Sequence, residues 1–228
     1  MKLKKIASLM LAGVMAVSML AGCQNANVDP EEPTDEPDVV VSDATNMLYS
    51  ELSGSAKAMV TATANADLDK ALQNAADKYW DYNSTAKLDK LIDVSNKNRE
   101  NHQHTWQAAG ALKSAMGADF TEFGKYDHWF DCDCTNFYAN NTSKKSMVTL
   151  YVVDASDSDA YVMEMLADKI DNAITRLPKA THGNIHDDYT YSYTVSASIA
   201  TKTVTFAGVD MGIKYVAVYM TQTPTENA

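Results

Sequence analysis

Residues 189–199 alternate strictly between apolar or aromatic side chains and hydroxyl side chains, and this pattern constrains the fold more than any other. Tyr, Val, Ala and Ile fill the odd positions, whereas Thr and Ser fill all the even ones. Successive side chains of a β-strand point to opposite faces, so the alternation predicts a strand with one buried face. We expect 203–207 to be its hairpin partner across 200–202.

Further strands and a helix are predicted on either side of this segment. After a break expected at 210–212, residues 213–220 are apolar on both faces except for Lys214, which is typical of a central strand. Residues 147–153 form another short apolar run rich in β-branched side chains and predict a buried strand. Between these strands, Ser156 or Ser158 is expected to cap a helix that ends before Pro178.

The first half of the chain has helical periodicity instead. Four short helices are expected, from residue 43 or 45 to about 60 with a weak point at Gly54, from about 67 to 80, from 84 or 85 to about 95, and from 105 to 116, with Gly117 ending the last. The fold class is therefore α+β: a helical layer of about four short helices precedes a β-α-β-β-β unit. Its sheet is expected to be mainly antiparallel and covered by helix on one face.

The N-terminus has the three-part build of a secretory signal. Lysines at positions 2, 4 and 5 precede an uncharged apolar stretch, 6–20, which is too short for a spanning helix. The run Leu20-Ala21-Gly22-Cys23 resembles the lipobox of bacterial lipoproteins. This resemblance implies cleavage before Cys23, a covalent diacylglycerol on its thiol, and a membrane-anchored protein that faces outside the cytoplasm.

The chain then divides into four expected parts: a signal peptide (1–22), a tether (23–43), one α+β domain (44–222) and a disordered tail (223–228). Within the tether, residues 29–38 hold six carboxylates and three prolines. Proline fixes φ and like charges repel, so this segment predicts an extended, solvated spacer.

The net charge of the mature chain restricts the kinds of partner that it can bind. Residues 1–22 hold three of the 19 basic residues and no acidic one, so the mature chain has 16 basic and 30 acidic residues and a formal charge of −14. Nucleic acids require a cationic face, so a nucleic-acid partner is not expected. The expected partners are the membrane, through the lipid, and an envelope or extracellular ligand; the oligomeric state is left open.

One dense cluster, 126–134, offers candidate chemistry. On a strand, His128, Cys132 and Cys134 would share a face, but they are only part of the four-ligand set that structural zinc usually takes. Pairing of Cys132 with Cys134 as a disulfide would require a bend at residue 133. Two free cysteines packed near the core are the simpler alternative.

Two further groups are weaker candidates. His182 and His186, beside two aspartates, could bind a divalent metal if their loop folded back. Tyr189, Tyr191 and Tyr193 could form a ligand face, although such rows more often pack under a helix. Zinc is not expected, and no cofactor is expected besides the diacylglycerol.

The sequence contains no nucleophile elbow, zinc-protease helix or phosphate-binding glycine loop, so no catalytic residue is assigned. We expect a non-catalytic lipoprotein that binds a small ligand, a peptide or another envelope component. The alternative is an envelope metal- or thiol-dependent enzyme that uses His128, Cys132 and Cys134.

Overall fold

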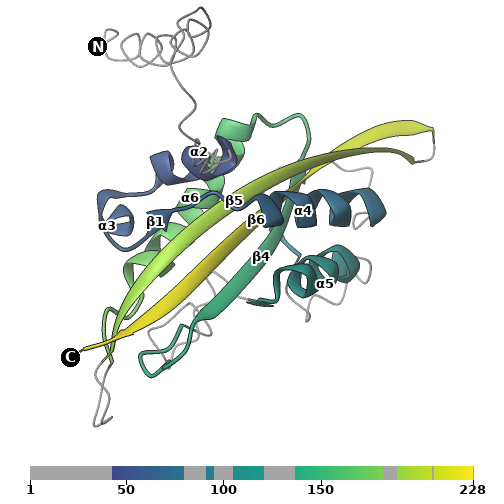
Figure 1. The fold of residues 1–228 in the computed structure, drawn as a ribbon. Coiled ribbons are helices and arrows are strands. Elements are labelled where there is room, and N and C mark those ends of the chain that lie inside the picture. Colours follow the sequence, from purple (N-terminus) through teal and green to yellow (C-terminus); the bar gives the residue numbers. More distant parts are fainter. Residues whose placement is uncertain are drawn as a thin grey trace, which may run out of the picture. The chain divides into compact units, whose positions relative to one another are not determined.

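The computed structural model describes residues 43–79, 91–94, 105–120, 137–181, 189–206 and 208–227. By its internal contacts the chain divides into two units, Met1–Asp38 and Val39–Ala228, and every described residue belongs to the second. This unit combines helices with a mixed sheet, which confirms the predicted α+β class (Figure 1).

Three long antiparallel strands form most of the sheet. They are β4 (Lys145–Asp154), β5 (Tyr189–Phe206) and β6 (Val209–Glu226), and β6 lies between the other two. Three two-residue strands extend the sheet: β1 (Thr61–Ala62) is parallel to β5, β2 (Ile92–Asp93) is antiparallel to β4, and β3 (Asp119–Phe120) is parallel to β4. The sheet is thus mainly antiparallel, as predicted, and 213–220 lies in its central strand.

The hairpin lies further along the chain than the sequence predicts. Strands β5 and β6 pair without interruption from Tyr189 opposite Glu226 to Phe206 opposite Val209. The turn expected at 200–202 is therefore wrong, because these residues pair with 213–215, and 210–212 belongs to β6. Gly208, at a φ of 80°, occupies the actual turn, where glycine adopts positive φ without steric cost. The tail expected at 223–228 is also wrong for 223–226, which pairs with 189–192.

Five helices are described in this unit: α2 (Asp43–Glu51), α3 (Gly54–Lys57), α4 (Ala66–Lys78), α5 (Thr105–Met116) and α6 (Asp159–Thr175). The first predicted helix is divided into α2 and α3, because the Ser53 side chain accepts the Ala56 amide and caps a new helix. The predicted cap of α6 is confirmed at Ser158, which accepts the amide of Tyr161 at 3.3 Å. Helix α5 has its predicted bounds and is followed by Gly117 at a φ of 57°.

The third predicted helix is wrong where the structure describes it. Ile92 lies in β2, opposite Val152 of β4, and the amide of Val94 donates to the carbonyl of Leu150 at 2.9 Å. Pairing with the long strand β4 outweighs the helical spacing of the apolar residues here. The remaining residues of this expected helix, 84–90 and 95, lie outside the described part of the chain.

Helices cover both faces of the sheet, so the expectation of a single covered face is wrong. On one face, α2, α3 and α6 pack against residues such as Tyr151 and Val216, and on the other, α4 and α5 pack against residues such as Leu150 and Tyr215. Figure 1 shows α6 and α4 on opposite sides of the long strands. The physical cause is that β4 and β6 present apolar side chains to both faces, and each face must be kept from water.

Lys214 is the one charged residue in 213–220, and its side chain is only 10% exposed. Its ammonium group donates to the carbonyl oxygen of Asp157 and to Oδ1 of Asp159, the latter at 2.5 Å. A buried charge is tolerated only when it is paired and hydrogen-bonded, so this lysine joins β6 to the start of α6.

Candidate functional site

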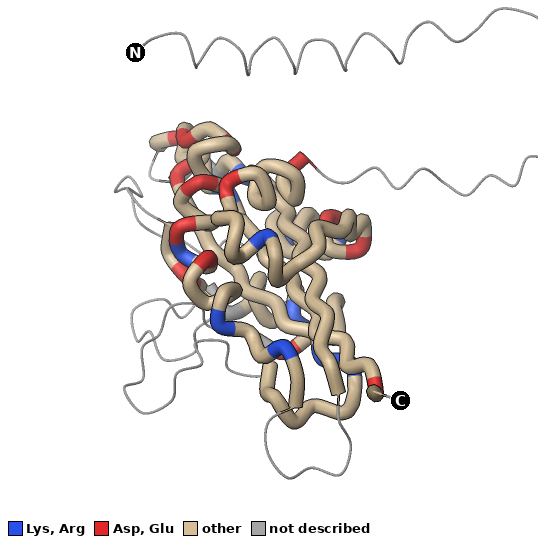
Figure 2. Tube along the Cα trace, turned by 90° about the vertical axis from the view of Figure 1, so that its left-hand side faces the viewer, with Lys and Arg blue, Asp and Glu red and all other residues tan. Residues whose placement is uncertain are grey.

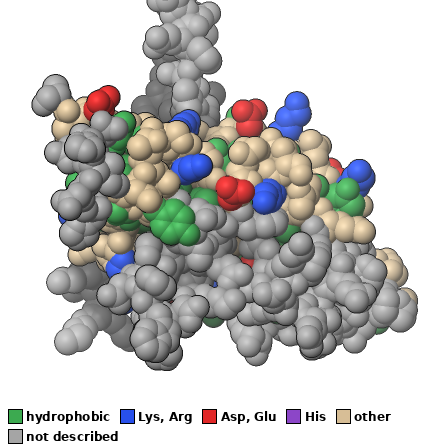
Figure 3. Space-filling view, turned by 90° about the horizontal axis from the view of Figure 1, so that it is seen from below, with side chains coloured by type: hydrophobic (Ala, Val, Ile, Leu, Met, Phe, Trp, Pro, Cys, Tyr) green, Lys and Arg blue, Asp and Glu red, His purple; other side chains and the backbone are tan. Residues whose placement is uncertain are grey.

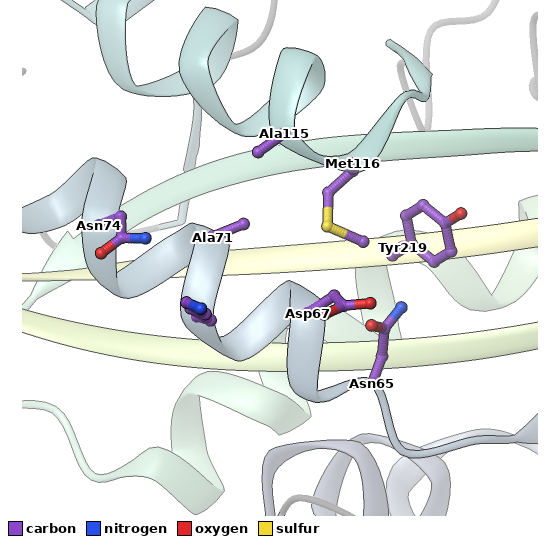
Figure 4. Close-up of a pocket in the computed structure, with 8 residues that line it drawn as sticks. Asn65, Asp67, Ala71, Asn74, Ala115, Met116 and Tyr219 are labelled. Atoms are coloured by element: carbon purple, nitrogen blue, oxygen red, sulfur yellow. The ribbon is translucent and has the colours of Figure 1, made fainter.

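A hollow of about 530 Å³ lies between α4, α5 and β6, and we call it the α4–α5 hollow (Figure 4). The lining residues come from three elements and from the residue before α4: Asn65, Asp67, Lys70, Ala71, Asn74, Ala115, Met116 and Tyr219. Figure 4 shows Met116 and Tyr219 on one side of the hollow and the polar side chains of α4 on the other.

Local helix chemistry places the polar groups of this hollow. Asn65 caps α4 by accepting the Leu68 amide through Oδ1 at 3.0 Å, and this leaves its amide nitrogen as a donor. Asp67 lies in the first turn of α4, where the positive end of the helix dipole favours a carboxylate. Together with Lys70, these residues offer donors, acceptors and both signs of charge within one turn of helix.

The opposite wall of the α4–α5 hollow is less polar. Tyr219 projects from β6 toward the face covered by α4 and α5 and is partly exposed, while Met116 ends α5. An aromatic ring beside hydrogen-bonding groups suits a ligand that has a flat or apolar side and polar edges. The arrangement can therefore hold a small polar molecule without any covalent chemistry.

A second hollow, of about 410 Å³, lies on the other side of α4, and we call it the α2–α4 hollow. It is lined by Asp43, Ala44, Met47, Asp69, Lys70, Gln73, Asp159, Ser198 and Ile199. The three carboxylates lie in the first turns of three different helices, α2, α4 and α6. Among the described residues no group of three or more His, Cys, Asp or Glu could hold a metal ion.

The three tyrosines considered as a ligand face do not form one open surface. Tyr193 is buried: its hydroxyl donates to the Pro178 carbonyl at 2.7 Å and accepts from Gln222 Nε2 at 2.9 Å. Its ring meets that of Phe137 edge to face, with centroids 5.7 Å apart. Tyr193 therefore belongs to the core.

Tyr191 and Tyr189 are half-buried. The Tyr191 hydroxyl is enclosed and has no hydrogen-bond partner among the described residues. Burial, with a smaller contribution from the charge of Tyr189, raises the pKa of Tyr191 above its ordinary value of 10.0. Tyr191 packs against the core cluster under α6. The ligand-face hypothesis is therefore restricted to the exposed parts of Tyr189 and Tyr191.

The remaining sequence candidates lie outside the described residues. This holds for the lipidation site Cys23, for the possible disulfide partners Cys132 and Cys134, and for the metal candidates His128, His182 and His186. Anchoring, thiol pairing, metal binding and the enzyme alternative therefore stay predictions from the sequence.

The residues of the α4–α5 hollow carry little signal in the sequence. Asn65 and Asp67 have the pattern of an ordinary helix start, and Tyr219 lies near the end of a strand that is apolar on both faces. The hollow arises because α4 and α5 pack side by side on the sheet but diverge around Met116 and Tyr219 (Figure 4). Only the tertiary arrangement brings these residues together.

The chain matches no known protein-family model, no curated protein and no solved structure. In the described part of the chain, the helices are too short or too polar to cross a membrane.

Proposed function

We propose that this protein is a membrane-anchored extracytoplasmic lipoprotein whose α+β domain is a non-catalytic ligand-binding module. The signal-like N-terminus, Cys23 and the acidic, proline-rich tether support the anchoring. The observation that carries the binding role is the α4–α5 hollow, in which polar groups of α4 face Tyr219 of β6.

The ligand is expected to be small, polar and close to neutral overall. The hollow offers one carboxylate, Asp67, one ammonium group, Lys70, and the side-chain amides of Asn65 and Asn74. Tyr219 adds a ring on which an apolar or flat surface can stack. Amino acids, short peptides and amino sugars have this combination of groups.

The anchoring is tested by expressing the full chain and its Cys23→Ala variant in a bacterium that processes lipoproteins. The unaltered chain should be recovered with the membrane and should carry a diacylglycerol-modified N-terminal peptide by mass spectrometry. The Cys23→Ala variant should lose the modification and leave the membrane fraction. An unmodified Cys23 in membrane-associated protein would contradict the proposal.

The binding role is tested with amino acids, dipeptides and N-acetylated amino sugars, by calorimetric titration of the mature protein in detergent micelles. A compound that binds in the hollow should bind at least roughly tenfold more weakly to Tyr219→Ala, because the stacking surface is lost. Tyr138→Ala is the matched control, since Tyr138 is 53% exposed and lies outside the hollow. Equal binding of a compound to Tyr219→Ala and Tyr138→Ala would contradict a site at this hollow. So would the failure of every compound in the panel to bind the unaltered protein.

A further inference from the structure

Among the described residues, the outer edge of β5 has no strand partner over part of its length, and we call that part the open edge. Near its start, the Tyr191 amide donates to the Lys179 carbonyl at 2.9 Å, and further along β1 pairs with 194–195. The Thr45 hydroxyl then bonds both the amide and the carbonyl of Ala197. Beyond Ala197, the described residues supply no partner on this edge.

Strand geometry shows which backbone groups are left open. The backbone N–H and C=O groups of Tyr191 and Ala197 make their hydrogen bonds on the side away from β6. Because these groups point to alternate sides along a strand, those of residues 199, 201, 203 and 205 point to the same outer side. Thr201, Thr203 and Thr205 are exposed. The opposite side of this segment is fully paired with β6, so it is held in extended form as a template for another strand.

This open edge has few of the features that usually protect a strand edge. Proteins place proline, bulges or projecting charges there to prevent unwanted pairing. Here the outward-bonding positions hold one isoleucine and three threonines. The single charge, Lys202, is held against α4, because its ammonium group donates to the carbonyls of Asp77 and Tyr79 at 2.9 and 3.1 Å.

Acidic groups lie at both ends of the open edge. The α2–α4 hollow, which adjoins Ile199, holds Asp43, Asp69 and Asp159 beside one cation, Lys70. Asp159 is paired with Lys214, so Asp43 and Asp69 against Lys70 leave the hollow with a net negative charge. At the other end, the Thr205 hydroxyl donates to Oδ1 of Asp210 at 2.6 Å. Figure 2 shows that most described Asp and Glu positions lie on the half of the domain away from the C-terminus. In contrast, the view from below shows scattered charges of both signs and small hydrophobic patches (Figure 3).

From this edge and its charges we infer that Ile199–Thr205 of β5 is a strand-addition site for an extended cationic segment of a partner protein. The inference rests on the proposed role as a binding module and names a second partner class for it. Backbone hydrogen bonds give affinity without sequence preference, and side chains at one end of the added strand reach the carboxylates of the α2–α4 hollow.

A second copy of this chain fits the edge less well. Antiparallel pairing of two such edges about a two-fold axis would place Ile199 of one copy opposite Thr205 of the other. The acidic hollow of each copy would then face Asp210 of its partner, and like charges would oppose each other. A lysine- or arginine-bearing strand has the opposite charge.

The inference is tested with a fluorescent, end-capped peptide of alternating lysine and threonine, titrated into the mature lipoprotein in detergent micelles. The peptide should bind saturably, whereas its glutamate counterpart should not. Two peptides should be compared, one N-methylated at the odd amides and one at the even amides. Only the peptide whose methyl groups replace the donors facing the edge should lose binding. Binding should weaken as salt is raised.

Two pairs of variants locate the site. Thr203→Pro removes an outward amide and should weaken binding roughly tenfold or more, whereas Thr203→Val keeps the amide and should bind normally. Asp69→Asn should weaken binding about 2- to 5-fold. Asp67→Asn, in the same helical turn but on the α4–α5 hollow, should not.

Equal binding of the lysine and glutamate peptides, or unchanged binding to Thr203→Pro, would overturn the inference. Sedimentation that shows a dimer, dissociated by Thr203→Pro, would replace the cationic partner with a second copy. Tyr219→Ala should leave peptide binding unchanged. The experiments therefore distinguish a wrong strand-addition proposal from a wrong proposal of a small-ligand site.

Discussion

The hydroxyl group of Thr45 makes two hydrogen bonds with the backbone of Ala197: it donates to the carbonyl oxygen at 3.0 Å and accepts from the amide at 2.9 Å. One side chain on α2 thus replaces a neighbouring strand at the point where β1 ends. Thr45 is only 1% exposed, so neither backbone group of Ala197 has ready access to water in its place. The contact joins α2 to the sheet as well as closing the edge.

Thr45→Val should destabilise the domain by about 2–4 kcal/mol, because the buried amide and carbonyl of Ala197 would both lose the hydrogen bond to the Thr45 hydroxyl. Thr45→Ser keeps the hydroxyl and should cost about 1 kcal/mol or less. Urea unfolding of residues 23–228 measures both changes. A loss under about 1 kcal/mol for Thr45→Val would show that the Ala197 backbone finds another partner.

Two glycines should respond oppositely to alanine. At Gly212, an added Cβ would lie 2.6 Å from the Ala155 Cβ, so Gly212→Ala should destabilise by about 1–3 kcal/mol through overpacking. At Gly54, no atom lies within 4 Å of the added Cβ, and α3 should gain about 0.5–1 kcal/mol. Thermal unfolding of the two variants checks the signs, and a neutral Gly212→Ala would contradict the close packing of β6 on Ala155.

The ion pair of Lys214 should show an asymmetry. Asp159→Asn leaves a buried ammonium group with weaker compensation and should cost about 1 kcal/mol, since the Asp159 side chain is 49% exposed. Lys214→Met removes the buried charge and keeps much of the packing, so its cost should be smaller. Urea unfolding of both single variants and the double variant gives the coupling energy. A larger loss for Lys214→Met would contradict this account.

Ionisation of Tyr191 should lower the folding stability at alkaline pH. Its pKa in the folded state is raised above 10.0 by burial, so the unfolded chain ionises first and folding stability is lost as the pH rises from about 10 through the folded pKa. Tyr191→Phe should make this alkaline loss shallower. Since the hydroxyl has no partner among the described residues, the variant should be neutral or up to about 1 kcal/mol more stable at pH 7. Marked destabilisation at pH 7 would reveal a partner for the hydroxyl.

Local pattern was sufficient for several elements and misleading for others. The strand at 189–199, the helix at 105–116 and the cap at Ser158 follow from side chains close in sequence, and all three are confirmed. The hairpin was misplaced because Ala200-Thr201-Lys202 is compatible with either a turn or a strand. The pairing of these residues with 213–215 and the positive φ of Gly208 decide between them.

The candidate sites depended still more on tertiary structure. Lys70 lines both hollows beside α4, yet nothing in its sequence neighbourhood distinguishes it from any exposed helical lysine. For the tyrosines at 189, 191 and 193, the alternation predicts a common face of the strand but not how deeply each ring is buried. Tyr193 is buried because Phe137 and Gln222 enclose it, and both lie far from it in the chain.

The α+β class, the apolar central strand, the acidic charge and the expectation of export all follow from the amino-acid sequence, because each depends on composition or on residues close together in the chain. The cover on both faces of the sheet, the stretch of β5 that the described residues leave unpaired and the positions of the two hollows became visible only in the folded domain. These features are set by contacts between residues that are far apart in the chain. Thr45 and Ala197 are 152 residues apart, and no local pattern encodes their meeting.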